Sequence, residues 1–162
     1  MSLPRPEFEN KIAAAGGIEA RVAALPRPLV FTNGVFDILH RGHVTYLARA
    51  RALGASLLVA VNGDASVKRL GKDGVRPVNP IEDRIAVLAA LDSTSLVTSF
   101  DEDTPLELIL RLRPEVLVKG GDWKTEAIVG ATQVRSWGGA VHSIPFEHQR
   151  STTAILARIR GR

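Results

Sequence analysis

The sequence contains no cysteine among its 162 residues, and it has only four histidines and one methionine. The lack of cysteine excludes disulfide bonds, thiolate zinc sites and cysteine nucleophiles. No apolar run approaches the length of about 18 residues that a membrane-spanning helix needs. Residues 1–11 carry acidic side chains and lack the apolar core of a signal peptide. We therefore expect a cytoplasmic protein with no membrane partner.

Aromatic residues are also scarce, at 5% of the chain, and they do not alternate with basic residues in any segment. Surfaces that stack the bases of nucleic acids need aromatic side chains beside their positive charges. The formal net charge is nevertheless +4, and the sequence pI is about 10.0. Scattered positive charge suits small polyanions, so we expect nucleotide phosphates, and not nucleic acid, as partners.

Short apolar runs rich in valine, leucine and isoleucine recur along the chain. They hardly alternate with polar residues, as expected of strands that are buried on both faces. Helical patterns separate most of them, and such alternation predicts a parallel sheet covered by helices. The predicted strands cover residues 29–32, 56–62, 95–100, 115–119 and 140–146, and the predicted helices cover residues 44–53, 81–91, 105–112 and 151–160.

The fold class that follows is α/β, with a Rossmann-like parallel five-stranded sheet and helices on both of its faces. The length fits one compact domain. We place a nucleotide-binding domain at residues 29–162 and an N-terminal helical extension at residues 1–28. In such sheets the ligand lies beyond the carboxyl ends of the strands, near the point where the strand order reverses. Polar residues that follow predicted strands are therefore candidates for one common site.

The first group of candidates, residues 32–43, runs from the first strand into the first helix. Gly34 permits a tight turn or a close backbone approach, and Gly42 leaves room for a phosphate beside the helix start. The free N–H groups there, with His40 and His43 as imidazole donors, can hold a triphosphate. Alternatively, the two histidines are surface or capping residues, or a metal pair, although no third ligand lies near. The setting between strand and helix favours an ATP site made of Thr32, Asn33, Gly34, Phe36, Asp37, His40, Gly42 and His43.

The second group opens the last helix with three consecutive hydroxyl residues, Ser151, Thr152 and Thr153. Hydroxyls at a helix start cap backbone N–H groups, and capping needs only one of them. The other hydroxyls can bind a phosphate together with the N–H groups of the first turn. We predict that all three residues contact the nucleotide, and that Arg150 beside them is a candidate for binding the substrate phosphate.

The third group, residues 118–123, follows the fourth strand. Gly121 permits a backbone turn against a flat ligand, and Asp122 can accept hydrogen bonds from ribose or sugar hydroxyls. Lys119 either contacts the nucleotide or is a solvated charge at the strand end. Trp123 either contacts the ligand or packs against the protein. We predict nucleotide contacts for Lys119, Gly121 and Asp122.

The fourth group, residues 62–76, follows the second strand and contains four basic residues. A charge run is usually a solvated face, but a mobile basic loop beside a triphosphate can neutralise the leaving pyrophosphate or an acceptor phosphate. We interpret this segment as such a loop. Lys68 is predicted to be catalytic, and Lys68 and Arg76 are candidates for binding the substrate phosphate.

The string His40-Arg41-Gly42-His43 resembles the H-x-G-H motif of the cytidylyltransferase-like nucleotidyltransferases. The run of three hydroxyl residues resembles the second phosphate motif of that family, and residues 119–123 resemble its K-G-x-D-[WY] loop. The resemblance implies that His40 and His43 are catalytic and hold the triphosphate of the donor. It also implies that Arg84, which resembles a family arginine near the phosphates, is a further substrate-phosphate candidate.

A narrower resemblance, from about Leu29 to Ile159, is to the heptose 1-phosphate adenylyltransferases, as a stand-alone adenylyltransferase domain. It rests on the strings TNGVFDILHRGH, VAVNGDASVKRL, RPVNP, LVKGGDW and STTAI. The resemblance implies ATP as donor and a sugar 1-phosphate, D-glycero-β-D-manno-heptose 1-phosphate, as acceptor, giving ADP-heptose for lipopolysaccharide or surface heptose biosynthesis. It further implies Mg²⁺ as cofactor, bound mainly through the ATP phosphates and not at a protein metal site, and a homodimer or larger homo-oligomer.

Two other functions remain open. One is transfer to another sugar or polyol phosphate, as in the glycerol-3-phosphate cytidylyltransferases. The other belongs to a different class, a nucleotide-binding module without catalysis, although the intact His40, Gly42 and His43 argue against lost activity. In a transferase of this kind an acceptor phosphate oxygen attacks the α-phosphorus of the donor directly. An ionised phosphate needs no general base, so catalysis would be positioning and charge stabilisation.

Overall fold

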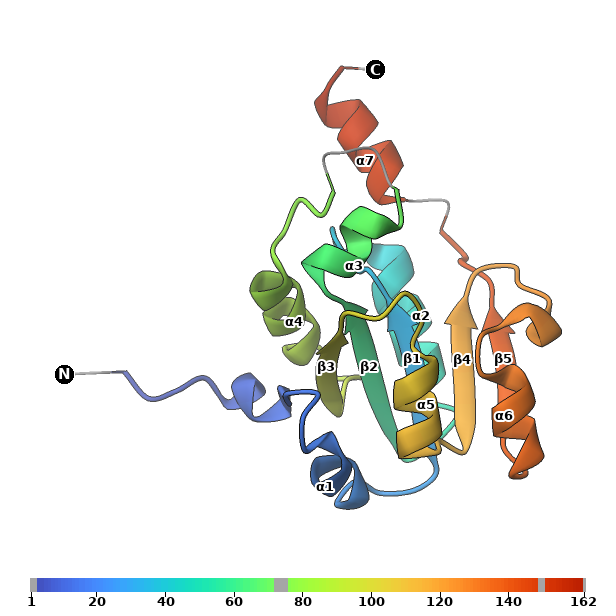
Figure 1. Cartoon of the computed structure of the whole chain (residues 1–162). Helices are drawn as coiled ribbons and strands as arrows, with labels where there is room; N and C mark the ends of the chain where they lie inside the picture. The colour runs from blue at the N-terminus through green and yellow to red at the C-terminus, as the bar shows by residue number, and fades with distance from the viewer. Residues whose placement is uncertain (1–2, 72–75, 149–150, 162) are drawn as a thin grey trace.

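The computed structural model describes residues 3–71, 76–148 and 151–161, and its centre is one five-stranded parallel sheet in the order β3-β2-β1-β4-β5. Figure 1 shows β1 in the middle of this sheet. The α/β prediction is confirmed, and each predicted strand is present with ends shifted by at most two residues. The strands are β1 (Leu29–Gly34), β2 (Ser56–Asn62), β3 (Leu96–Phe100), β4 (Val116–Gly120) and β5 (Ala140–Ile144).

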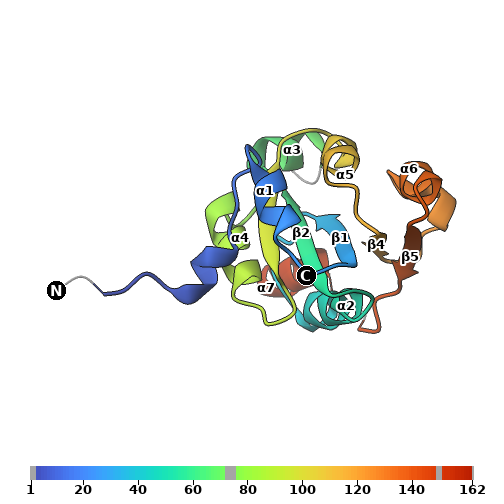
Figure 2. The same ribbon diagram turned by 90° about the horizontal axis from the view of Figure 1, so that it is seen from below.

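Helices cover both faces of the sheet because successive strand residues point to opposite sides. On one face, Phe31 and Leu58 pack with α1 (Ile18–Ala23), α5 (Leu106–Leu112) and α6 (Ala131–Ser136). On the other face, Val30 and Val59 pack with α2 (Arg41–Arg51) and α4 (Ile81–Ala89). Figure 2 shows α1 and α5 on one side of the sheet and α2 on the other. The two buried layers explain why the strands hardly alternate in polarity.

The segment after β2 is the main correction to the predicted architecture. Instead of a loop, Asp64–Arg69 forms the short helix α3. Val67 is fully buried, and the Ser66 hydroxyl donates to the carbonyl of Glu102. These contacts with the segment after β3 hold a turn that the local charge run did not reveal. The structure also contains α6, the 3-10 helices η1 (Glu7–Lys11) and η2 (Thr125–Ala127), and the predicted last helix, α7 (Thr152–Ile159).

The N-terminal segment packs into the same body as the sheet. Ile12 bridges Val97 of β3, and the Ala13 N–H donates to the carbonyl of Val97 at 2.9 Å. Ile18 and Val22 of α1 are buried in the core on the α5 side. Within residues 3–28 the helical elements are η1 and α1, and the side chains of this segment pack against both apolar layers of the sheet.

The strand order creates a site at the carboxyl ends of β1 and β4. The chain leaves β1 towards α2 on one face, and it enters β4 from α5 on the opposite face. Neighbouring connections that diverge in this way open a crevice between them. The start of α7 lies beyond the same edge of the sheet (Figure 1). None of the helices in the described ranges is long and apolar enough to cross a membrane.

Candidate functional site

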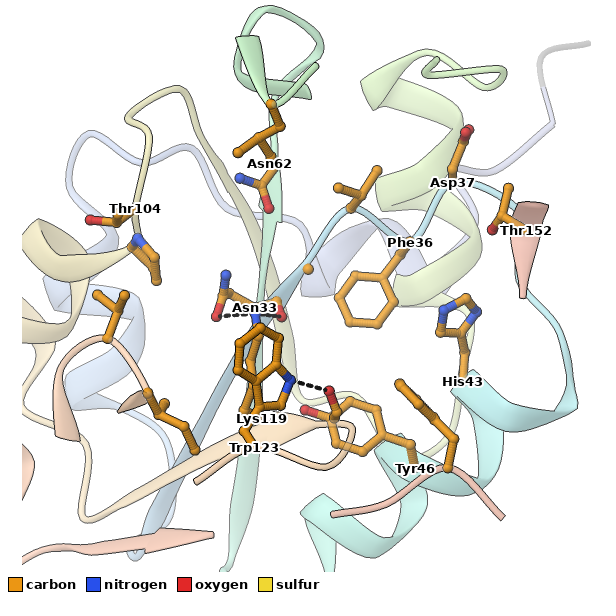
Figure 3. Close-up of a pocket in the computed structure, with 18 of the residues that line it drawn as sticks. Asn33, Phe36, Asp37, His43, Tyr46, Asn62, Thr104, Lys119, Trp123 and Thr152 are labelled. Atoms are coloured by element: carbon orange, nitrogen blue, oxygen red, sulfur yellow. Dashed lines mark hydrogen bonds between the residues drawn. The ribbon is translucent and has the colours of Figure 1, made fainter. Parts of the chain in front are cut away.

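A cavity of about 510 Å³ lies at the carboxyl edge of the sheet, where the strand order predicts a ligand site (Figure 3). Its walls come from the segments that follow β1, β2, β3, β4 and β5 and from the first turn of α7. The residues that line it are Asn33, Gly34, Val35, Phe36, Asp37, His43, Tyr46, Asn62, Leu70, Arg76, Asp103, Thr104, Pro105, Lys119, Gly120, Trp123, Ala127, Ile128, Val129, Phe146 and Thr152.

The two histidines of the predicted phosphate site stack on each other at the start of α2. Their ring centroids are 3.9 Å apart, with an angle of 24° between the planes. His40 is the N-cap residue of α2, and its ring lies over the first turn. A Cβ at Gly42 would lie 3.0 Å from two atoms of the His40 ring. Glycine is therefore needed there to let His40 lie against His43, and only His43 of the pair lines the cavity.

His43 is held in its neutral form. Burial, and then the positive charges of His40 and Arg76, lower its pKa to about 4, against a small opposite effect of the Ile38 carbonyl. A neutral imidazole carries one N–H donor at neutral pH. An anionic ligand beside it would favour the protonated form and raise the pKa. His43 can therefore meet a phosphate as a hydrogen-bond donor and gain positive charge as negative charge arrives.

Asp37, which was predicted to belong to the ATP site, lines the cavity and also holds a neighbouring arginine in place. Its carboxylate is buried and accepts from the Arg76 Nε at 3.1 Å and from the N–H groups of Val78 and Asn79 at 2.8 and 3.0 Å. Burial alone would raise its pKa, but these hydrogen bonds and the Arg76 charge hold the pKa below its ordinary value. Asp37 thus orients Arg76, whose side chain is only 11% exposed and lines the cavity.

Phe36 shapes the wall next to His43. Its φ angle of 48° lies in the left-handed region, which a non-glycine residue adopts only where its surroundings stabilise it. The ring contacts His43 edge to face, with centroids 5.5 Å apart. A Cβ at Gly34 would lie 2.9 Å from the same ring. The glycine predicted to permit a close approach thus admits the Phe36 ring.

The start of α7 brings one of its three hydroxyl residues to the cavity. The Ser151 hydroxyl accepts from the Ala154 N–H at 3.1 Å and caps the helix. Thr152 is buried and lines the cavity, whereas Thr153 is exposed and does not. Capping by one hydroxyl leaves Thr152 available to a ligand. The predicted phosphate contact of Arg150 lies outside the described residues.

Of the three residues predicted at the end of β4 and after it, only Lys119 lines the cavity. Lys119 lines the cavity, and its Nζ donates to the carbonyl and to the side-chain oxygen of Asn33 at 3.4 and 3.3 Å. Gly121, with a φ of 114°, and the exposed Asp122 do not line the cavity. Trp123 does, and its indole N–H donates to the Gly120 carbonyl at 3.1 Å.

Arg84 is a second correction, because the structure does not bring it to the cavity. Its side chain is fully buried, and its Nη1 donates to the carbonyls of Val35 and Asn62 at 2.7 and 2.8 Å. Its Nε donates to the carbonyl of Asn79 at 3.0 Å, and its Nη2 pairs with Asp64 at 2.6 Å. Every guanidinium nitrogen is thus committed to the protein. Arg84 holds together the segments that surround the site, and it does not line the cavity.

Two more predicted residues lie away from the cavity. Lys68 is exposed on α3 and is not among the lining residues, so the geometry lends no support to its predicted catalytic role. Thr32 is buried behind the wall and hydrogen-bonds the hydroxyl of Tyr46. Burial raises the pKa of that phenol, which therefore stays protonated.

Several lining residues were not singled out from the sequence, although some of them carried a usable signal. Tyr46 lies one helical turn after His43, on the same face of α2. Asn62 is the last residue of β2, in a position similar to that of Asn33 near the end of β1. Phe146 follows β5. The rule that ligands lie beyond the carboxyl ends of strands would have found both. Ile128 and Val129 lie in a connection without a recognisable motif, so nothing in the sequence indicated them.

Comparisons with known proteins agree with this arrangement. A model of the cytidylyltransferase-like family matches residues 31–158. The chain is 59% identical over 155 residues to the D-beta-D-heptose 1-phosphate adenylyltransferase of Bordetella bronchiseptica, covering 94% of this chain and 96% of that protein. It is 58% identical over 131 residues to the bifunctional protein HldE of Citrobacter koseri, of which it spans only 27%.

Solved structures share the fold. The lipopolysaccharide core biosynthesis protein of Thermoplasma volcanium has a TM-score of 0.61 and 27% identity, covering 75% of this chain and 98% of that one. The pantoate-beta-alanine ligase of Francisella tularensis has a TM-score of 0.59 at 14% identity, covering 88% and 68%, and at this identity it shows the fold alone. The family match extends from β1 into α7 and includes the stacked histidine pair. The chain therefore belongs to the cytidylyltransferase-like family.

Proposed function

We propose that the protein transfers AMP from ATP to D-glycero-β-D-manno-heptose 1-phosphate, giving ADP-heptose and pyrophosphate for lipopolysaccharide or surface heptose biosynthesis. The observation that carries the proposal is the 59% identity, over nearly the full length of both chains, to a D-beta-D-heptose 1-phosphate adenylyltransferase. The cavity supports it, because one end of this space gathers cationic and hydroxyl groups and its other walls present amide and aromatic groups.

The phosphate-binding end is formed by His43, Arg76 and Thr152. Arg76 carries a permanent charge and is held by the buried Asp37. His43 adds a donor whose protonation rises when an anion binds. The N-terminus of α2, an eleven-residue helix, begins beside them, and helix N-termini favour negative charge. These groups suit the triphosphate of ATP, together with the charge that develops as pyrophosphate leaves.

The reaction needs no covalent enzyme intermediate. An oxygen of the acceptor phosphate attacks the α-phosphorus of ATP while the bond from that phosphorus to the bridging oxygen of pyrophosphate breaks. The electron pair of the broken bond leaves with pyrophosphate. Because the acceptor phosphate is already ionised, a general base is not required. The protein orients the two phosphates and stabilises the charge on the departing one.

Mg²⁺ is proposed as the cofactor that accompanies ATP. Among the residues that the structure describes, no group of three or more histidine, aspartate or glutamate side chains could hold a metal ion. The carboxylate of Asp37, which lines the cavity, already accepts three hydrogen bonds, from Arg76, Val78 and Asn79. This donor set fits an ion whose ligands are mostly phosphate oxygens and water. When bound, Mg²⁺ would neutralise part of the phosphate charge.

The decisive experiment is mass spectrometry of the products formed from ATP or CTP with heptose 1-phosphate or glycerol 3-phosphate. We expect ADP-heptose and pyrophosphate from ATP with heptose 1-phosphate. Formation of CDP-glycerol without ADP-heptose would contradict the proposed donor and acceptor. It would still support nucleotidyl transfer as the reaction. Nucleotide binding without any pyrophosphate release would indicate a non-catalytic module. Light scattering after size-exclusion chromatography tests the proposed homodimer or larger oligomer.

A further inference from the structure

Two asparagines project into the cavity from neighbouring strands, away from the phosphate-binding end. Asn33 lies near the carboxyl end of β1, and Asn62 ends β2, which pairs with β1. Both residues line the cavity, and Asn62 is only 5% exposed. Figure 3 shows their carboxamides on opposite sides of the same space, with His43 farther away beside Thr152. The pair is not accounted for by phosphate binding, since neither side chain carries charge.

The carboxamide of Asn62 is fixed in one orientation. The hydroxyl of Ser66 donates its only proton to the carbonyl of Glu102 at 3.1 Å. Towards Asn62, at 3.1 Å, Ser66 Oγ can therefore only accept, so the Asn62 atom that it contacts is the Nδ2 donor. The side-chain oxygen of Asn62 then faces the cavity, as Figure 3 shows. The protein thus presents an acceptor at this point.

The carboxamide of Asn33 is also fixed, but with its N–H donor, and not its oxygen, towards the cavity. The ammonium of Lys119 has donors and no acceptor, so its 3.3 Å contact identifies the Asn33 atom as the side-chain oxygen. The Nδ2 of Asn33 then points into the cavity (Figure 3). One wall therefore offers an N–H donor and the other an oxygen acceptor, and each orientation is imposed by a neighbour that has no alternative.

We propose that Asn33 and Asn62 form a hydroxyl-recognition pair that determines which acceptor the enzyme uses. A hydroxyl group both donates and accepts, so a polyhydroxylated sugar can satisfy the two carboxamides together. An acceptor with fewer hydroxyls leaves buried amide groups unpaired and is disfavoured. This inference rests on the proposed function, and it assigns Asn33 to the acceptor instead of the nucleotide contact predicted from the sequence.

The arrangement of the sheet separates this pair from the nucleotide base. Two of the aromatic residues that line the cavity, Trp123 and Phe146, follow β4 and β5, whereas Tyr46 packs against Phe146 and Phe36 packs against His43. Gly120 permits this wall, because a Cβ there would lie 2.7 Å from the Phe146 ring. The asparagines lie on the other side, at β1 and β2. An aromatic base suits the aromatic wall, which leaves the amide wall to the acceptor.

The test compares Asn33→Asp and Asn62→Leu with the matched control Asn10→Asp, an exposed asparagine of η1. Asn33→Asp keeps an oxygen for Lys119 and turns the cavity-facing donor into an acceptor. We expect the KM for heptose 1-phosphate to rise about tenfold to a hundredfold in both variants. The KM for ATP should change by less than about twofold, because neither variant touches the phosphate-binding end. The preference for heptose 1-phosphate over glycerol 3-phosphate should fall in parallel.

Calorimetric titration of heptose 1-phosphate, with an unreactive ATP analogue present, gives a second readout that needs no turnover. Weaker binding by Asn33→Asp, with thermal unfolding like that of the wild type, supports the inference even if Asn62→Leu fails to fold. An increased KM for ATP alone would overturn it in favour of ribose binding, and unchanged constants would overturn it outright. If the wild type binds heptose 1-phosphate but releases no pyrophosphate, the proposed function fails. Comparing the affinities of the wild type and the variants for heptose 1-phosphate still tests the role of the two asparagines. A wild type that does not bind it contradicts both.

Discussion

Arg76 and Arg84 lie eight positions apart and each pairs with an aspartate, yet they serve different purposes. Arg76 donates through Nε to the buried Asp37 and borders the cavity. Arg84 donates through all three guanidinium nitrogens to carbonyls and to Asp64, and its side chain has no exposed surface. An arginine can bind a phosphate only with donors that the fold has not already used. The two arginines carry the same charge, and they differ in how many of their donors the protein already uses: Arg76 keeps donors that a ligand could use, whereas Arg84 is structural.

The largest expected effect is on stability, from Arg84→Met. The substitution leaves the carbonyls of Val35, Asn62 and Asn79 without their donor in a buried region, which we expect to lower the free energy of unfolding by about 3 kcal/mol or more. Urea denaturation measures it. The matched control is Arg111→Met, whose ion pair with Glu19 lies on the surface and should matter far less. Equal effects of the two substitutions would refute the structural role of Arg84.

His43→Ala should lower turnover by roughly a hundredfold or more, the scale of losing one preorganised donor that stabilises developing charge. The fold should survive, because the ring borders a cavity. Initial rates of pyrophosphate release, with circular dichroism as the check on folding, measure the effect. Near-normal turnover in a folded variant would remove His43 from the mechanism.

His43 should also make stability depend on pH. Its pKa is about 4 in the folded state, below the ordinary value near 6.5, so the unfolded chain binds more protons between these pH values. The contribution of His43 to the free energy of unfolding is therefore fully present above about pH 6.5. It decreases as the pH is lowered, by about 2 kcal/mol between pH 7 and pH 5. His43→Asn should remove this part of the slope in denaturation curves. An unchanged slope would show that His43 is not held neutral.

Arg76→Gln sharpens the comparison with Arg84. It should raise the KM for a phosphorylated substrate about tenfold, as expected for losing a charged hydrogen bond. The loss of stability should be smaller than in Arg84→Met, because the glutamine amide can still donate towards Asp37. Steady-state kinetics and urea denaturation on the same preparations give both values. A loss of stability equal to that of Arg84→Met, without a kinetic effect, would make the two arginines equivalent.

The smallest effect is expected from Lys68→Ala. The side chain is exposed on α3 and does not line the cavity, so kcat/KM should change by less than about threefold, through long-range charge alone. Raising the salt concentration should reduce the difference further. A hundredfold loss would instead show that α3 moves to the cavity during turnover and would restore the catalytic role predicted from the sequence.

Much of the architecture could be predicted because it depends on local pattern. The five apolar runs became five parallel strands, and the glycine and histidine spacing marked the start of α2. The site could be predicted only in part. Residues that were not singled out, such as Asn62 and Phe146, lie far apart in the sequence and meet only because parallel strands end at one edge of the sheet.

The sequence by itself determined the class of fold, the edge of the sheet that carries the cavity, and the two helix starts that bring His43 and Thr152 to it, because periodicity and helix-start chemistry are local properties. Only the tertiary structure decided how each polar group is used. Arg84 donates to carbonyls from three segments, Asp37 pairs with Arg76, and Ser66 and Lys119 set the orientations of Asn62 and Asn33. Such roles follow from hydrogen-bond partners that lie far apart in the chain, and a buried polar group takes the partner that the fold places beside it.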